Sequence, residues 1–125
     1  MVTPEDDQPR SVLVVDDDDD FRHLALSIVH SWGHEVSEAA TVASALQVAA
    51  EVRPDTVLAD VGLPDGDGFE LARRLVAQVP QVRVVLISSD ADAGAGGAAE
   101  RAGALGFFAK DKLASRALRD MIDGR

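Results

Sequence analysis

The sequence contains no cysteine, and this absence excludes several classes of protein at once. Without cysteine there is no disulfide framework, no cysteine-ligated zinc or iron–sulfur cluster and no thiol nucleophile. Tyrosine is absent too, and the other large aromatics amount to four Phe and one Trp. The 46% of hydrophobic residues must therefore build a core from Val, Leu, Ile and Ala, which is a composition typical of α/β proteins.

Basic residues and long apolar runs are scarce as well. Lys and Arg number 12 against 22 Asp and Glu, and the net charge of −10 disfavours direct contact with nucleic acid or an anionic membrane. No apolar run approaches the roughly eighteen residues of a membrane-spanning helix, and residues 1–10 lack the apolar stretch of a signal peptide. We expect a cytoplasmic protein with a flexible segment over 1–10 and one domain over 11–123.

Short β-branched runs alternate with amphipathic helical segments along the whole of that domain. The alternation predicts an α/β fold in which crossover helices join parallel strands. Five strands are expected, at 11–15, 35–38, 56–59, 82–87 and 104–109. The first helix carries apolar residues at spacings of three and four, which form one face: Phe21, Leu24, Ala25, Ile28, Val29 and Trp32. Gly33 is placed to end this helix, and Thr41 is placed to begin the next one.

An unbroken run of five aspartates, 16–20, follows the first strand directly. Ligands of an open parallel sheet bind beyond the carboxyl ends of its strands. The polar residues at those positions are, in chain order, Asp16, Asp17, Asp60, Ser88, Ser89 and Lys110. In the flavodoxin-like strand order 2-1-3-4-5, strands one and three are neighbours, so the three carboxylates converge. The other three aspartates of the run begin the first helix, where acids favour the helix dipole and one caps the end.

Carboxylates that share one cleft repel each other unless a cation compensates their charge. Mg²⁺ is the natural candidate, because it prefers hard oxygen ligands and binds through one or two carboxylates together with phosphate oxygens. A carboxylate beside Mg²⁺ and a lysine is also a nucleophile toward phosphorus, since both cations neutralise the equatorial oxygens of the transferring group. The residue set therefore points to phosphoryl transfer onto a carboxylate.

Four motifs appear in a specific order and spacing. They are Val-Val-Asp-Asp at 14–17, Leu-Ala-Asp-Val-Gly-Leu-Pro-Asp-Gly-Asp-Gly at 58–68, Leu-Ile-Ser-Ser at 86–89 and Ala-Gly-Ala-Leu-Gly-Phe-Phe-Ala-Lys at 102–110. With them, residues 11–122 resemble the receiver domain of two-component response regulators. The Lys-Asp pair at 110–111 resembles receivers joined to LuxR-type DNA-binding domains. The resemblance implies a flavodoxin-like (βα)5 fold: a five-stranded parallel sheet in order 2-1-3-4-5 with helices on both faces.

The resemblance also implies a metal-dependent phosphoacceptor. Asp60 would take a phosphoryl group from the phosphohistidine of a sensor kinase or phosphotransfer protein. Mg²⁺ would be held by the side chains of Asp17 and Asp60 and by the backbone carbonyl of Gly62, while Asp16 would orient water and metal. The protein would then be a signalling phosphoacceptor, whose only catalysis is its own phosphorylation and dephosphorylation.

A switch is implied by the same resemblance. Lys110 would pair with the phosphoryl oxygens, and Ser88 would donate its hydroxyl to them. Phe107 would swing inward behind Ser88 as the switch aromatic. This movement would change the surface formed by the fourth helix, the fifth strand and the fifth helix, which would control an output domain or a protein partner. The resemblance also admits a homodimer, without direct contact with nucleic acid or membrane.

Two departures from the family pattern stand out. Asp111 replaces the proline that commonly follows the lysine, and Gly94, Gly96 and Gly97 fall inside the fourth helix expected over 90–103. Glycine costs about 1 kcal/mol against alanine in a helix interior, so this helix carries a handicap of roughly 3 kcal/mol. We expect it to be only partly formed in the resting protein and to be ordered by phosphorylation or by a partner.

Two other functions compete with phosphotransfer signalling. The first is a receiver-like module that binds partners without being phosphorylated, a reading kept open by Asp111 and the glycines. The second is a Mg²⁺-dependent phosphatase resembling the haloacid-dehalogenase family, because Asp16-Asp17-Asp18 contains an Asp-x-Asp after the first strand. In that phosphatase the modified residue would be Asp16 rather than Asp60.

Overall fold

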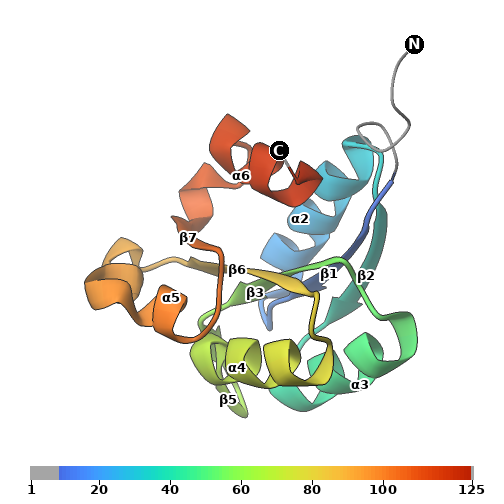
Figure 1. Cartoon of the computed structure of the whole chain (residues 1–125). Helices are drawn as coiled ribbons and strands as arrows, with labels where there is room; N and C mark the ends of the chain where they lie inside the picture. The colour runs from blue at the N-terminus through green and yellow to red at the C-terminus, as the bar shows by residue number, and fades with distance from the viewer. Residues whose placement is uncertain (1–8, 125) are drawn as a thin grey trace.

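A computed structural model of the chain describes residues 9–124, apart from the side chain of Ala95, and these residues form a parallel sheet between two layers of helices (Figure 1). Most of the predicted flexible segment 1–10 lies outside the described residues. The strands are β1 (Ser11–Val15), β2 (Glu35–Ala39), β3 (Thr56–Asp60), β6 (Arg83–Ser88) and β7 (Gly106–Ala109). They pair in the order β2-β1-β3-β6-β7, all parallel, which confirms the predicted flavodoxin-like order.

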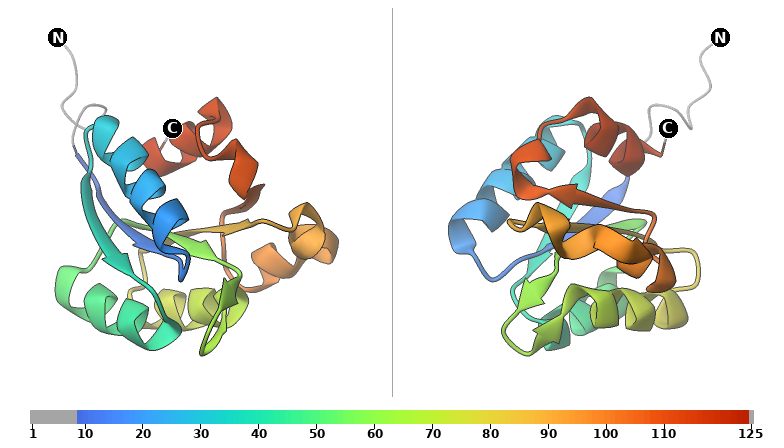
Figure 2. Two further views of the ribbon diagram at one scale, coloured as in Figure 1. Left: turned by 180° about the vertical axis from the view of Figure 1, so that it is seen from behind. Right: turned by 90° about the vertical axis from the view of Figure 1, so that its left-hand side faces the viewer.

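Helices follow the strands in alternation, as Figure 2 shows from two further sides. The α-helices are α2 (Asp19–Ser31), α3 (Val42–Val52), α4 (Gly68–Gln78), α5 (Ala98–Arg101) and α6 (Arg116–Asp123). Two 3-10 segments, η1 (Ala91–Gly97) and η2 (Lys110–Lys112), and a small antiparallel pair, β4 (Gly62–Leu63) with β5 (Gly66–Asp67), complete the fold. Among the described helices, none is long and apolar enough to cross a membrane.

The central strands are buried on both faces because helices cover both. On β1, Leu13 and Val15 face the layer of α3, α4 and α5, whereas Val12 and Val14 face the layer of α2 and α6. All four side chains are inaccessible to solvent. This double burial explains why the strand reads as a continuous apolar run rather than an alternating one. Polar residues of the strands are consequently concentrated at their ends.

The predicted helix ends are confirmed, and one predicted core residue is wrong. Asp18 caps α2 with its carboxylate, and Gly33, with a φ of 95°, follows the last turn in the left-handed region. Thr41 caps α3 in a reciprocal pair with Ser44. Leu24, expected on the buried face of the first helix, is 53% exposed, because the apolar stripe in contact with the sheet runs along the neighbouring positions of α2.

The helix expected over 90–103 is not continuous. Residues 91–97 form the 3-10 segment η1, and only 98–101 form an α-helical turn. Gly96 and Gly97 have φ values of 77° and 78°, which no α-helix accommodates. A Cβ on Gly94 would lie 2.5 Å from Cγ of Phe107, so the aromatic ring occupies the space that a larger side chain would need.

The two ends of the folded domain meet at the edge of the sheet where β1 begins. The main-chain N–H of Arg10 donates to Nδ1 of His34 at 3.0 Å, and its Nε donates to the carbonyl of Asp123 at 2.9 Å. Nε2 of the buried His34 lies 2.6 Å from the carboxylate of Asp123. Because Nδ1 accepts a hydrogen bond, the ring proton of the neutral histidine lies on Nε2 and is donated to that carboxylate.

The loop after β3 is tied to a helix that precedes it in the chain. Both carboxylate oxygens of Asp65 accept N–H groups from the first turn of α3, those of Val42 at 2.7 Å and Ala43 at 3.0 Å. The hydrogen bonds from Ala43 and Val42 lower the pKa of Asp65. This exposed aspartate therefore connects the loop that follows Asp60 to the N-terminus of α3.

Asp65→Ala is expected to lower the thermal unfolding midpoint at neutral pH. Because the pKa of Asp65 is lowered in the folded state, its stabilisation is present above the unfolded-state pKa and is lost as the pH falls through the folded-state pKa. The difference between variant and wild type should therefore vanish in acid. Glu51→Ala, which removes an exposed acid from α3, is the control and should show no such pH dependence. An unchanged midpoint for Asp65→Ala at neutral pH would contradict the assignment.

Candidate functional site

Three carboxylates converge at the carboxyl edge of the sheet, as predicted. Asp16 and Asp17 follow β1, Asp60 is the last residue of β3, and these two strands are paired with Val15 opposite Ala59. One carboxylate oxygen from each of the three aspartates lies within 4.8 Å of the others. Asp16 is fully buried and Asp60 is 8% exposed, whereas Asp17 is exposed. The site thus has a buried floor and one acid open to solvent.

A single ammonium group reaches two of these carboxylates. Lys110 begins η2 directly after β7, and its Nζ lies 2.8 Å from Oδ2 of Asp16 and 3.5 Å from Oδ2 of Asp60. The ring of Phe21, in the first turn of α2, lies beneath the same ammonium, 4.4 Å from Nζ to the centroid. The lysine predicted from its place after the fifth strand is therefore part of the acidic cluster.

The ionised form of Asp60 is disfavoured by its surroundings in the cluster. Burial and the neighbouring charge of Asp16 raise the pKa of Asp60, and Lys110 offsets only part of this effect. Burial alone would lower the pKa of Lys110, but its contacts with Asp16 and Asp60 outweigh burial and raise it. The lysine therefore stays charged at neutral pH, while the cluster still carries more negative than positive charge.

The donor set suits Mg²⁺. Oδ1 of Asp16 accepts the N–H of Asp18 at 2.9 Å, whereas the buried Oδ2 forms an ion pair with Lys110 but has no hydrogen-bond partner among the described residues. Each of the three acids offers one carboxylate oxygen to the cluster, and hard oxygen ligands from one or two carboxylates are what Mg²⁺ typically takes from a protein. A divalent cation there would also favour the ionised form of Asp60, whose pKa is raised by burial and by the charge of Asp16.

The remaining predicted residues lie around this cluster. Ser88 ends β6, one residue after the Ile87 that pairs with Asp60; it is buried and accepts the N–H of Asp90 at 3.0 Å, whereas Ser89 is exposed. Gly62 lies in β4, two residues after Asp60, and is exposed. Phe107 is half-buried and packs with the α3 and α4 layer.

The peptide between Lys110 and Asp111 is trans, since the described residues contain no cis bond.

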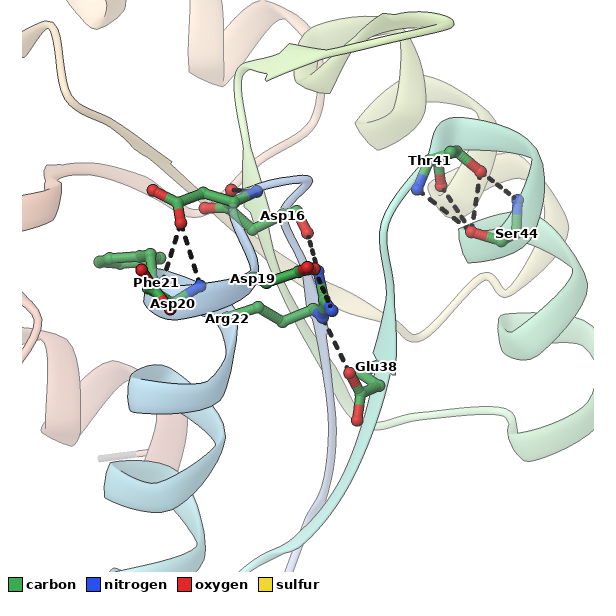
Figure 3. Close-up of polar contacts among 9 residues, drawn as sticks. Asp16, Asp19, Asp20, Phe21, Arg22, Glu38, Thr41 and Ser44 are labelled. Carbon is green, nitrogen blue, oxygen red and sulfur yellow. Dashed lines mark hydrogen bonds and ion pairs between the residues drawn. The ribbon is translucent and has the colours of Figure 1, made fainter.

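Sequence reasoning missed Arg22, which lies behind the acidic loop (Figure 3). Its side chain is buried, and the guanidinium donates to the backbone carbonyl of Asp16 at 2.8 Å, to Glu38 at 2.8 Å and to Asp19 at 2.7 Å. A signal was available in the sequence. Arg22 occupies the same helical stripe as Ala25 and Val29, and a charged residue in an apolar stripe needs buried partners.

Comparison with known proteins identifies the family. The protein-family model of the response regulator receiver domain matches residues 12–123. The chain belongs to this family. The resemblance predicted from the four motifs is thus confirmed, and the chain is a receiver domain of the kind found in two-component response regulators.

Named relatives place this receiver among regulators and phosphorelay proteins. The DNA-binding transcriptional activator DevR/DosR of Mycobacterium tuberculosis is 40% identical over 94 residues, which cover 72% of this chain and 43% of that protein. The sporulation initiation phosphotransferase F of Bacillus subtilis is 30% identical, and the match covers 79% of this chain and 80% of that protein. The KDP operon transcriptional regulatory protein KdpE of Escherichia coli is 36% identical, with coverage of 80% and 44%. This receiver thus corresponds to less than half of DevR/DosR and of KdpE.

Solved receiver structures share the fold. The signal receiver domain of the response regulator NarL from Mycobacterium tuberculosis superposes with a TM-score of 0.80 at 30% identity, over 94% of this chain and 99% of that one. A two-component response regulator of the LuxR family from Aurantimonas has a TM-score of 0.84 at 25% identity, over 94% and 88%. The likeness to LuxR-family receivers expected from the Lys-Asp pair agrees with this second match.

Asp60→Asn is expected to raise the free energy of unfolding in EDTA at neutral pH. The raised pKa of Asp60 means that the folded state holds its proton more tightly than the unfolded chain, so the ionised carboxylate destabilises the fold. The gain should appear as a higher thermal midpoint than that of wild type, measured in the same buffer.

The pH dependence and a matched variant check this prediction. The gain should appear as the pH rises through the unfolded-state and then the folded-state pKa of Asp60, and it should be absent in strong acid. Asp17→Asn removes an exposed acid of the same cluster and should give a smaller gain. A lower midpoint for Asp60→Asn than for wild type at neutral pH would contradict the electrostatic account.

Proposed function

We propose that this receiver is a phosphoacceptor whose nucleophile is Asp60. The observation that carries the proposal is the position of Lys110, whose ammonium lies between the buried Asp16 and Asp60 at the edge of the sheet. A carboxylate paired with a cation beside further acids is arranged for transfer of a phosphoryl group, because charge develops on that group's equatorial oxygens. The name of the phosphotransferase relative from Bacillus subtilis agrees with such chemistry.

In the proposed reaction, a carboxylate oxygen of Asp60 attacks the phosphorus of a phosphohistidine on a sensor kinase or phosphotransfer protein. The new O–P bond forms as the P–N bond breaks, and the imidazole leaves with the electron pair of that bond. Lys110 stays protonated and pairs with the phosphoryl oxygens. Asp17, Asp60 and the carbonyl of Gly62 hold Mg²⁺, which neutralises charge on the transferring group when bound, and Asp16 orients water and metal.

The proposed output is a change on the surface of α5, β7 and α6. The buried Ser88 at the end of β6 donates its hydroxyl to the phosphoryl group, and Phe107 moves inward behind it. The surface then acts on an output domain or a protein partner. A DNA-binding output agrees with the name of DevR/DosR. The charge of −10 favours contact with DNA through another domain rather than through the receiver itself. We place the protein in the cytoplasm.

Acetyl phosphate with Mg²⁺ is expected to modify Asp60, as located by mass spectrometry of the digested protein. Asp60→Asn should abolish the modification. Lys110→Met should slow it by about 100-fold, because the group that neutralises the transferring oxygens is lost. Lys112→Met, which removes an exposed lysine of η2, is the matched control and should react like wild type.

The other outcomes select the competing functions. Modification of Asp16 would favour the phosphatase, and no modification of the wild type would favour a module that binds partners without phosphorylation. Modification of Asp60→Asn at the wild-type level would refute the assignment of the nucleophile.

Amide exchange across 93–99 is expected to be fast in the unmodified protein and slower with beryllofluoride, a phosphoryl mimic. The reason is that η1 lacks the hydrogen bonds of a continuous α-helix, and we expect phosphorylation or a partner to order it. Gly94→Ala should displace the Phe107 ring without any mimic, visible as shifted ring resonances, because the added Cβ would collide with the ring. Gly96→Asn, at an open left-handed position, should leave them unchanged. Slow exchange across 93–99 in the unmodified protein would contradict the hypothesis that this segment is only partly formed in the resting state.

A further inference from the structure

Arg22 holds the backbone of the acidic loop, whereas Lys110 contacts its carboxylates. The guanidinium is buried against β2 and forms three hydrogen bonds of 2.7 to 2.8 Å with Asp16, Asp19 and Glu38. Figure 3 shows these bonds spreading from one side chain to the loop, the first turn of α2 and the edge strand. The side chains of Asp19 and Glu38 are exposed, whereas the carbonyl of Asp16 belongs to a residue with no accessible surface.

Asp16 is fixed in four directions. Its N–H donates to the carbonyl of Ala39 at 3.1 Å, and its carboxylate is held by the N–H of Asp18 and by Lys110. The remaining polar group, the backbone carbonyl, is held by Arg22 at 2.8 Å. Removal of Arg22 would leave a buried carbonyl without this donor, and the peptide that follows Asp16 would be free to rotate.

That peptide leads directly to Asp17. Because the peptide unit is planar, the direction of the Asp16 carbonyl fixes the direction of the Asp17 N–H and the position of its Cα. Asp17 is exposed, so packing contributes little to holding its side chain near Asp60. The bond from Arg22 is thus a constraint that acts on the exposed acid of the cluster through the backbone.

The charge of Arg22 is already balanced. Hydrogen bonds with Glu38 and Asp19 raise the pKa of Arg22 against the effect of burial, so the guanidinium remains protonated. Its two carboxylate partners lie in the first turn of α2 and on β2, and neither belongs to the three acids that converge at the edge of the sheet. The positive charge of Arg22 is therefore neutralised by Glu38 and Asp19, and it adds little repulsion to a cation bound in the cluster.

We propose that Arg22 is a positioning residue for the metal: it orients the Asp16–Asp17 peptide so that Asp17 and Asp60 share one Mg²⁺. This inference rests on the proposed function and deepens it, since it assigns to a residue outside the cluster the geometry of an exposed ligand. A partner that orients a ligand in this way typically contributes a factor of about 10 to 100 to metal affinity.

The test is a Mg²⁺ titration of the whole chain without any phosphoryl donor, followed by the amide NMR signals of Asp17 and Asp60. Arg22→Gln should weaken Mg²⁺ binding by about tenfold. Arg22→Lys keeps the charge but cannot make all three bonds, and it should weaken binding by a similar factor. Glu38→Ala frees one side of the guanidinium and should weaken binding by about twofold. Arg74→Gln, at an exposed position of α4, is the control and should bind like wild type.

Phosphorylation by acetyl phosphate gives a second readout. In Arg22→Lys the Mg²⁺ concentration for half-maximal rate should rise by about tenfold, whereas the rate at saturating Mg²⁺ should match wild type. A variant that lowers the unfolding midpoint but leaves the Mg²⁺ affinity within about twofold of wild type would reduce Arg22 to a structural role and overturn the inference. Loss of Mg²⁺ binding or of Asp60 modification in the wild type would instead overturn the proposed function.

Discussion

The like charge of three carboxylates at one edge of the sheet is the constraint on which the rest of this receiver depends. Asp16, Asp17 and Asp60 are brought together by the pairing of β1 with β3, and burial denies Asp16 and Asp60 the screening of water. Lys110 neutralises the cluster only in part, so the site is poised to accept a further positive charge. The two apolar layers supply the stability that lets the fold tolerate this local cost.

Two basic side chains divide the work of holding the acidic loop. Lys110 contacts carboxylates and is accessible to whatever enters the site, whereas Arg22 is buried and contacts the backbone. The first can change partners during a reaction, because an ammonium is a flexible point charge on a long stem. The second cannot do so readily, because its planar fork is committed to three acceptors at once. The loop therefore combines one adaptable contact with one fixed contact.

Much of this arrangement could be predicted from the sequence, for physical reasons that also show where prediction stops. The alternation of strands and helices follows from periodicity along the chain, whereas the strand order that brings Asp16, Asp17 and Asp60 together was implied by the resemblance to receiver domains. Leu24 and Arg22 were misjudged or missed, because the orientation of a helix on its sheet decides which edge of its apolar stripe is covered. That orientation is set by packing between distant segments, which local spacing does not contain.

The segment after β6 shows the same limit in another form. The glycines predicted a weakened helix, and the structure has a 3-10 segment in its place. The sequence alone did not reveal that Gly94 leaves room for the ring of Phe107. A glycine both weakens a helix and leaves space for a neighbouring side chain. The helix cost can be estimated from the sequence, whereas the use of the space cannot. The second requires knowing which residue of β7 faces that turn.

The hydrogen bond from Arg10 to Asp123 holds the two ends of the folded domain next to each other. Any polypeptide joined to either end would leave from one attachment point, at the amino edge of the sheet, while the acidic cluster lies at the opposite, carboxyl edge. A few residues would suffice to bridge the two ends, so a circularly permuted chain, opened at an exposed loop, could retain the same sheet. The acidic site therefore depends on which strands are neighbours in the sheet and not on the order of the strands along the chain.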